Sequence, residues 1–198
     1  MKTARYLCAS LLSVAAFSAN ALPTVAFDQS VLSVHVGDTF ELVLQGSGFD
    51  FDADGKLINN VTGGQSFDLS FGAAALQLVD VEIASRWIFT SGNKTGDVDN
   101  TAGTLTGLAF GTFPATADDS FDIATLRFQA IGAGSTDVVV TSGTVVARVD
   151  NVSGSSISSV FDPTNVSVTS PVPEPETWAM MLAGLGMLGW QARRRLSN

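Results

Sequence analysis

Cysteine and histidine are nearly absent from this chain. Its 198 residues include one cysteine, Cys8, and one histidine, His35. Because Cys8 lies in the first 21 residues, the rest of the chain contains no thiol. Disulfides, thiolate catalysis and cysteine-ligated metals are therefore excluded there, and a single histidine cannot build a zinc site. We expect His35 to face outward from a strand, on the same side as Ser33.

Basic residues are also scarce, and half of them lie at the two ends. The chain has ten Lys and Arg against nineteen Asp and Glu. Residues 22–171 hold seventeen of the acidic side chains and five of the basic ones, a formal charge of −12. A surface of this charge repels nucleic acid and anionic lipid, and it attracts cations. The composition excludes nucleic-acid binding as a function.

Residues 1–21 have the three parts of a secretory signal peptide. A positively charged start is followed by an apolar run from Leu7 to Phe17. Ala19 and Ala21 then supply the small residues that signal peptidase requires. The alternative, an N-terminal core helix, is disfavoured by the Leu22-Pro23 dipeptide that follows. We expect an exported protein whose mature chain begins at Leu22.

Residues 172–198 predict a short C-terminal membrane span. The stretch from Thr177 to Ala192 has sixteen residues and no charge. As a helix it would be about 24 Å long, shorter than the roughly 30 Å hydrocarbon core of a bilayer. The arginine cluster Arg193, Arg194 and Arg195 should stay in the cytoplasm, which places the preceding domain outside.

The same segment resembles a known sorting signal. Val172-Pro173-Glu174-Pro175, the short Gly- and Leu-rich span and the final arginines resemble the PEP-CTERM signal of Gram-negative bacteria that make extracellular polysaccharide. The resemblance implies that an exosortase, a transpeptidase-like membrane enzyme, recognises Pro173, Glu174 and Pro175 and removes the tail. By the same resemblance, the arginines set the orientation of a transient anchor. A permanent tail anchor is the alternative.

The central residues 22–171 read as one all-β domain. Short β-prone runs alternate with Gly, Asn, Asp and Ser, and no stretch has a helical period. About nine strands, including Ser66–Phe71 with its inward Phe67, Leu69 and Phe71, predict an antiparallel two-sheet sandwich. The other expected strands are 32–36, 39–45, 76–84, 105–110, 123–130, 137–141, 145–150 and 166–169. The aromatic residues expected in the core are Phe40, Phe67, Phe71, Phe110, Phe121 and Phe128.

The order of these runs resembles a cohesin domain, a nine-strand jelly-roll-like sandwich. The resemblance rests on Val36–Phe40, on Phe67–Phe71 leading through a small-residue turn into Leu76–Val81, and on Ile123–Ala130 before Gly132–Thr136. Cohesins bind dockerin modules through one sheet face. The resemblance therefore implies a binding module whose partner is a dockerin-like protein. It assigns no individual contact residues.

One acidic motif has the spacing of a calcium loop. Asp50, Asp52 and Asp54 alternate before Gly55, so their carboxylates could converge on one hard cation. The twelfth position is Val61 rather than the bidentate glutamate, and no helices flank the loop. A calcium site and a solvated acidic hairpin both stay open. A second acidic stretch, Asp97 to Asn100, is interpreted as a solvated loop.

These features predict a non-enzymatic protein of the cell surface or extracellular matrix. One hypothesis is a module that binds a dockerin-like protein or an extracellular polysaccharide through a sheet face. The alternative is a structural component of the extracellular polymer with no discrete ligand. A polysaccharide-active enzyme is the third hypothesis, since carboxylates are plentiful, but the sequence selects no catalytic pair and contains no Gly-x-Ser-x-Gly motif.

Overall fold

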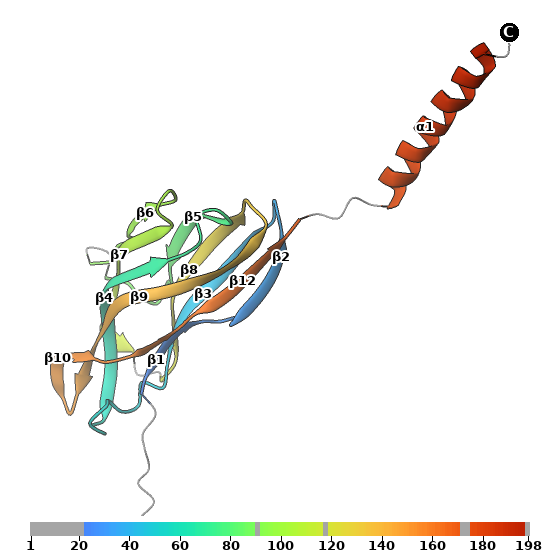
Figure 1. Ribbon diagram of the computed structural model, residues 1–198. Helices are drawn as coiled ribbons and strands as arrows, with labels where there is room; N and C mark the ends of the chain where they lie inside the picture. The colour runs from blue at the N-terminus through green and yellow to red at the C-terminus, as the bar shows by residue number, and fades with distance from the viewer. Residues whose placement is uncertain (1–21, 90–91, 117–118, 171–174, 197–198) are drawn as a thin grey trace, which may run out of the picture.

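The computed structural model describes residues 22–89, 92–116, 119–170 and 175–196. The predicted signal peptide, with Ala19 and Ala21, lies outside these residues. Every regular element between residues 22 and 170 is a strand, and a single helix follows (Figure 1). The elements are β1 (Thr24–Phe27), β2 (Val31–His35), β3 (Thr39–Ser47), β4 (Ile58–Ser70), β5 (Leu76–Ile83), β6 (Asp97–Asp99), β7 (Thr104–Thr116), β8 (Phe121–Ala130), β9 (Gly134–Val149), β10 (Val152–Ile157), β11 (Val160–Asp162), β12 (Thr164–Thr169) and α1 (Pro175–Leu196).

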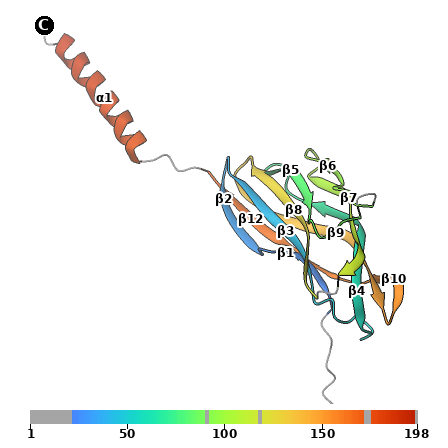
Figure 2. The ribbon, with the colours of Figure 1, turned by 180° about the vertical axis from the view of Figure 1, so that it is seen from behind.

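The strands form the predicted two-sheet sandwich. One sheet has five strands in the order β11-β1-β3-β8-β5. The other has seven, in the order β2-β12-β9-β4-β7-β6, with β10 paired to β9. The end of the sandwich that carries the β10 hairpin lies far from the end at which β12 leaves toward α1 (Figures 1 and 2).

Two features of the topology differ from the prediction. The described residues contain twelve strands rather than about nine. β1, β6 and β11 are too short to stand out in the sequence, and β10 consists mostly of Ser and Gly, whereas two predicted strands merge into β9. The sandwich is also not purely antiparallel. β1 pairs with β11 and β2 pairs with β12 in parallel, so both early strands join strands from the end of the domain.

Two strands, β4 and β9, run through glycines that are typical of a break in a strand. β9 continues across Ser142-Gly143-Thr144, where the prediction has two separate strands. The glycines are explained by the ring of Phe67, which is fully buried. A Cβ at Gly143 would lie 2.3 Å from Cδ1 of that ring, and one at Gly64 would lie 2.7 Å from Cε2. Glycine is therefore needed at both positions because the core aromatic fills the space.

The aromatic core largely matches the prediction. Of the six expected residues, Phe40 is half-buried and stacks on Phe128 with ring centroids 5.7 Å apart, and the other five are buried. Two further core members come from loops. Trp87 packs against Phe110 at 4.6 Å, and Phe49 packs against Phe121 at 5.1 Å. The indole N–H of Trp87 donates to the Asp122 carbonyl at 2.8 Å, which satisfies the buried polar atom.

Short polar side chains bond to the backbone where strand pairing lapses. At the open edge of β5, Asn100 Oδ1 accepts the Leu78 N–H at 2.8 Å, and Asn100 Nδ2 donates to the Leu78 carbonyl at 3.0 Å. The Asn100 side chain thus makes the two backbone hydrogen bonds at Leu78 that a neighbouring strand would otherwise make. At the end of β2, Asp38 Oδ2 accepts the His35 N–H at 2.8 Å. The interpretation of Asn100 as part of a solvated loop is therefore wrong.

We expect Gly64→Ala to destabilise the sandwich by about 1–3 kcal/mol, because the new methyl group overpacks the space taken by the Phe67 and Phe110 rings. Urea unfolding measures the loss. Gly111→Ala on β7 is the control, since a Cβ there meets only ordinary contacts at 3.5 Å or more. Equal stability of the two variants would contradict the packing argument.

We expect Asn100→Ala to lower the free energy of unfolding by about 1–3 kcal/mol, because both backbone groups of Leu78 lose their partner. Asn100→Asp should also destabilise the fold, since a carboxylate can accept the Leu78 N–H but cannot donate to its carbonyl. Thr101→Ala, next to it and exposed, is the control and should stay within about 0.5 kcal/mol of wild type. Unfolding of all three variants in urea provides the comparison.

Candidate binding surfaces and the C-terminal tail

The outer face of the seven-stranded sheet contains an open depression of about 480 Å³. It lies over β4 and β7 and reaches Val146 on β9. Four of its lining residues are glycines: Gly63, Gly64, Gly92 and Gly107. At Gly63 the strands approach so closely that an added Cβ would lie 2.3 Å from the Phe110 carbonyl oxygen. At Gly107, in contrast, an added Cβ would meet nothing within 4 Å, so the missing side chain leaves open space.

Polar side chains surround this depression, and it has no carboxylate in its lining. The Thr62 hydroxyl is already used, because it donates to the Val146 carbonyl at 2.9 Å. Gln65, Ser66 and Lys94 also line the depression. Within the described residues, none of these three side chains makes a hydrogen bond or an ion pair. They are donors and acceptors available to a ligand.

An exposed aromatic side chain stands beside the depression. Phe89 is 52% exposed, and its ring lies against Gly92, where an added Cβ would be 2.5 Å from the ring carbon Cδ1. The loop that carries it is fixed at both ends. Trp87 is buried in the core, and Asn93 donates to the Trp87 carbonyl and accepts the Gly111 N–H of β7. Because Phe89 N–H also donates to the Gly111 carbonyl at 3.0 Å, the backbone at this ring is anchored to the sheet.

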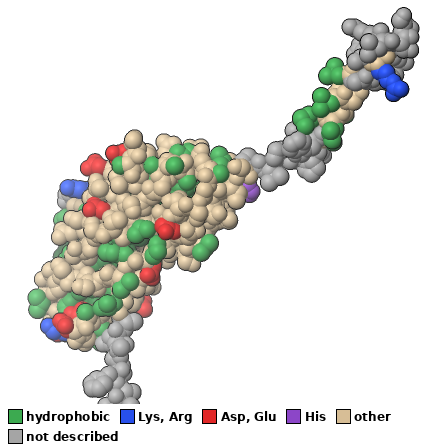
Figure 3. Space-filling model, viewed as in Figure 1, with side chains coloured by type: hydrophobic (Ala, Val, Ile, Leu, Met, Phe, Trp, Pro, Cys, Tyr) green, Lys and Arg blue, Asp and Glu red, His purple; other side chains and the backbone are tan. Residues whose placement is uncertain are grey.

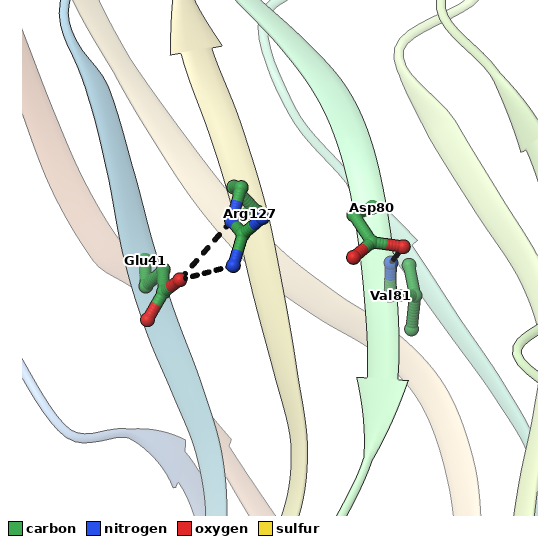
Figure 4. Close-up of polar contacts among 4 residues, drawn as sticks. All are labelled: Glu41, Asp80, Val81 and Arg127. Atoms are coloured by element: carbon green, nitrogen blue, oxygen red, sulfur yellow. Dashed lines mark hydrogen bonds and ion pairs between the residues drawn. The ribbon is translucent and has the colours of Figure 1, made fainter.

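The outer face of the five-stranded sheet is different, because it carries an ion pair between neighbouring strands. Arg127 on β8 donates to Glu41 on β3 through Nη2 at 2.8 Å and Nε at 3.1 Å (Figure 4). The hydrogen bond and charge of Glu41, with smaller contributions from Asp80 and Glu82, raise the pKa of Arg127. Asp80 accepts the Val81 N–H at 3.0 Å. Across the visible face of the sandwich the carboxylates are scattered rather than gathered into one patch (Figure 3).

The predicted calcium loop forms a closed turn. Phe51 and Leu57 pair across it, and Asp52 Oδ1 accepts the N–H groups of Asp54 at 3.0 Å and Lys56 at 2.8 Å. Asp50, Asp52 and Asp54 are not brought together. Within the described residues, no group of three or more His, Cys, Asp or Glu is placed to hold a metal ion. The calcium site stays a prediction.

His35 lies as the sequence predicts, exposed at the end of β2. Its Nδ1 is 3.6 Å from Asp38 Oδ2, and both side chains are more than half exposed. His35 does not line the depression over β4 and β7.

The C-terminal helix α1 spans Pro175–Leu196 and is longer than the predicted stretch 177–192. Pro175 suits its first turn, because proline lacks the N–H that would be unpaired there. Arg193 is exposed and, like Arg194 and Arg195, lies within the helix rather than after it. No helix in the described ranges is long and apolar enough to cross a membrane. Pro173 and Glu174 lie outside the described residues.

Comparison with known proteins supports both halves of this description. Residues 171–195 match a family model described as the PEP-CTERM protein-sorting motif. A comparison with curated proteins gives no match. The sandwich is similar to solved cohesin structures, and the low sequence identities limit that similarity to the fold.

Three of these structures illustrate the similarity. The seventh ScaB type I cohesin of Pseudobacteroides cellulosolvens has a TM-score of 0.59 at 15% identity, over 77% of this chain and 96% of that one. A type I cohesin–dockerin complex of Clostridium thermocellum, Coh-OlpC-Doc435, gives 0.58 at 12% identity, over 79% and 99%. The cohesin module of a Clostridium perfringens family 33 glycoside hydrolase gives 0.55 at 14% identity, over 76% and 97%. The chain thus has a cohesin-like sandwich followed by a PEP-CTERM sorting motif.

The closed turn at Asp52 favours the solvated hairpin over the calcium site. We therefore expect the melting temperature of the protein to stay unchanged in millimolar calcium, since no preformed cage of oxygen ligands gains by binding. Differential scanning calorimetry with calcium and with EDTA makes the measurement. A calcium-dependent rise that disappears in Asp50→Asn would instead establish the loop as a site.

Proposed function

We propose that this protein is exported, processed at its C-terminus by an exosortase-type enzyme, and displayed at the cell surface as a non-catalytic binding module. The observation that carries the proposal is the position of the sorting motif. It begins at residue 171, directly after β12 ends at Thr169. A sorting motif in this position can be removed without cutting into the folded domain.

The distribution of the core supports this separation. All buried hydrophobic residues of the described core cluster lie between Val25 and Val168, so none of the described side chains of α1 belongs to it. The apolar side chains of α1 stay exposed, Met180 by 75% and Leu182 by 65%. Loss of α1 therefore removes exposed apolar surface and leaves the described core cluster in place. These are the properties expected of a segment that is temporary.

The fold and the surfaces support a binding role for the sandwich. Five of the similar structures are complexes of cohesins with dockerins, so this architecture holds a protein partner in those cases. In this chain the outer face of the seven-stranded sheet offers an open depression with unpaired polar side chains. We propose that this face, rather than the five-stranded sheet with its internal Glu41–Arg127 pair, is the binding face.

The processing step is tested by the intact mass of the native protein from surface fractions, in strains with and without the exosortase-type enzyme. We expect a surface form that begins at Leu22 and ends within residues 173–176. The strain without the enzyme and the variant Glu174→Ala should both retain the tail through Asn198. Glu176→Ala, outside the Pro-Glu-Pro element, is the control and should be processed normally.

The opposite result would be a chain that ends at Asn198 in both strains. It would mean a permanent anchor, and the processing part of the proposal would be wrong.

A further inference from the structure

We infer that the depression on β4 and β7, with Phe89 beside it, is a binding site for a neutral oligosaccharide segment. The inference rests on the proposed binding function and assigns its site and ligand class. Its volume of about 480 Å³ falls in the range of small-ligand sites, which is about 300–1,000 Å³. Three properties of this surface favour such a ligand: an aromatic ring, polar groups without partners among the described residues, and the local charge.

The aromatic ring has no structural reason to be exposed. Trp87, two residues earlier, is 3% exposed and packs on Phe110 and Phe121, so the core beneath this loop is already filled. Phe89 instead presents half of its surface to solvent next to a polar hollow. A pyranose ring has one face of C–H groups, and a phenyl face is an apolar partner for it. Phenylalanine beside hydroxyl and amide groups matches both sides of a sugar.

The polar groups around the hollow offer both donors and acceptors. The amide of Gln65 and the hydroxyl of Ser66 can each donate and accept, and Lys94 donates through its ammonium group. None of them is engaged with the described part of the chain. Sugar hydroxyls require this mixture, because each one loses hydrogen bonds to water on binding and needs them replaced. An apolar peptide side chain would leave these polar groups unpaired.

Local charge selects among saccharides. Residues 22–171 carry a formal charge of −12, so a polyanionic polysaccharide is repelled at long range. The lining of the depression contains no carboxylate and one lysine, which reduces the repulsion locally, but one cation cannot offset the whole domain. A neutral chain avoids this cost. The charge distribution therefore favours a neutral polysaccharide over an acidic one.

The site is also held in place before a ligand arrives. Asn93 bonds to the Trp87 carbonyl and to the Gly111 N–H, so the loop is tied to the core and to β7. A ring on an anchored loop loses little conformational freedom when a ligand stacks on it, which favours affinity.

The test is affinity electrophoresis of the full mature protein in native gels that contain dextran, glucomannan or hydroxyethylcellulose, with alginate as the polyanion. We expect retardation by at least one neutral polysaccharide and none by alginate. Phe89→Ala and Lys94→Ala should each weaken the retardation at least tenfold in polysaccharide concentration. The controls are Phe51→Ala and Lys56→Ala, which remove the same exposed residue types from the 50–57 turn. Thermal unfolding of each variant confirms that it is folded.

Three results would overturn the inference. They are no retardation by any of the neutral polysaccharides, retardation that Phe89→Ala leaves unchanged, and retardation by alginate alone. The proposed binding function is judged separately, by saturable retention of a secreted protein on the immobilised mature chain. Retention that Phe89→Ala abolishes, without any neutral polysaccharide effect, would keep the binding face and replace the saccharide by a protein partner.

Discussion

The structure depends on supplying a partner to every backbone N–H and C=O group in strands that do not match in length. β4 and β9 are long and bulged, whereas β6 and β11 have three residues each. The backbone hydrogen bonds between strands are therefore interrupted at many points. A backbone group left without a partner away from water costs free energy comparable to a lost hydrogen bond. Asp and Asn side chains fill these gaps. Asp68 accepts the Gly107 N–H at 2.8 Å and Asp28 accepts the Val43 N–H at 3.0 Å, as Asn100 does for Leu78.

This use of Asp and Asn changes the meaning of the acidic composition. The sequence suggests a cation-attracting surface, but several carboxylates are already committed to the backbone. Asp52 and Asp99 each accept two N–H groups of their own turn. Part of the negative charge is therefore a by-product of a fold with many irregular strand ends. The same reasoning explains why the carboxylates are scattered, since each lies where a ladder or turn requires it.

The sequence predicts the elements that have a strong local pattern and misses those that depend on distant contacts. Strict alternation around Phe67 and the PEP-CTERM motif are both local patterns. The burial along β4 confirms the first, and the family match over residues 171–195 confirms the second. Glycine at position 143 reads locally as a break, whereas its cause is the Phe67 ring from another strand. Asn100 reads as a loop residue because its partner Leu78 is 22 positions away. The depression is not visible in the sequence at all, since it arises from two strands and an anchored loop that only the fold brings together.

The parallel pairing of β12 has a mechanical consequence. β12 lies inside its sheet, between β2 and β9, and it is the last strand before the sorting motif. If the processed C-terminus is the point of attachment, a drag force on the domain pulls β12 along its own axis. The hydrogen bonds to both neighbours then carry the load together, in shear, rather than opening one at a time from an end. A domain attached through this strand would therefore resist flow at its point of attachment.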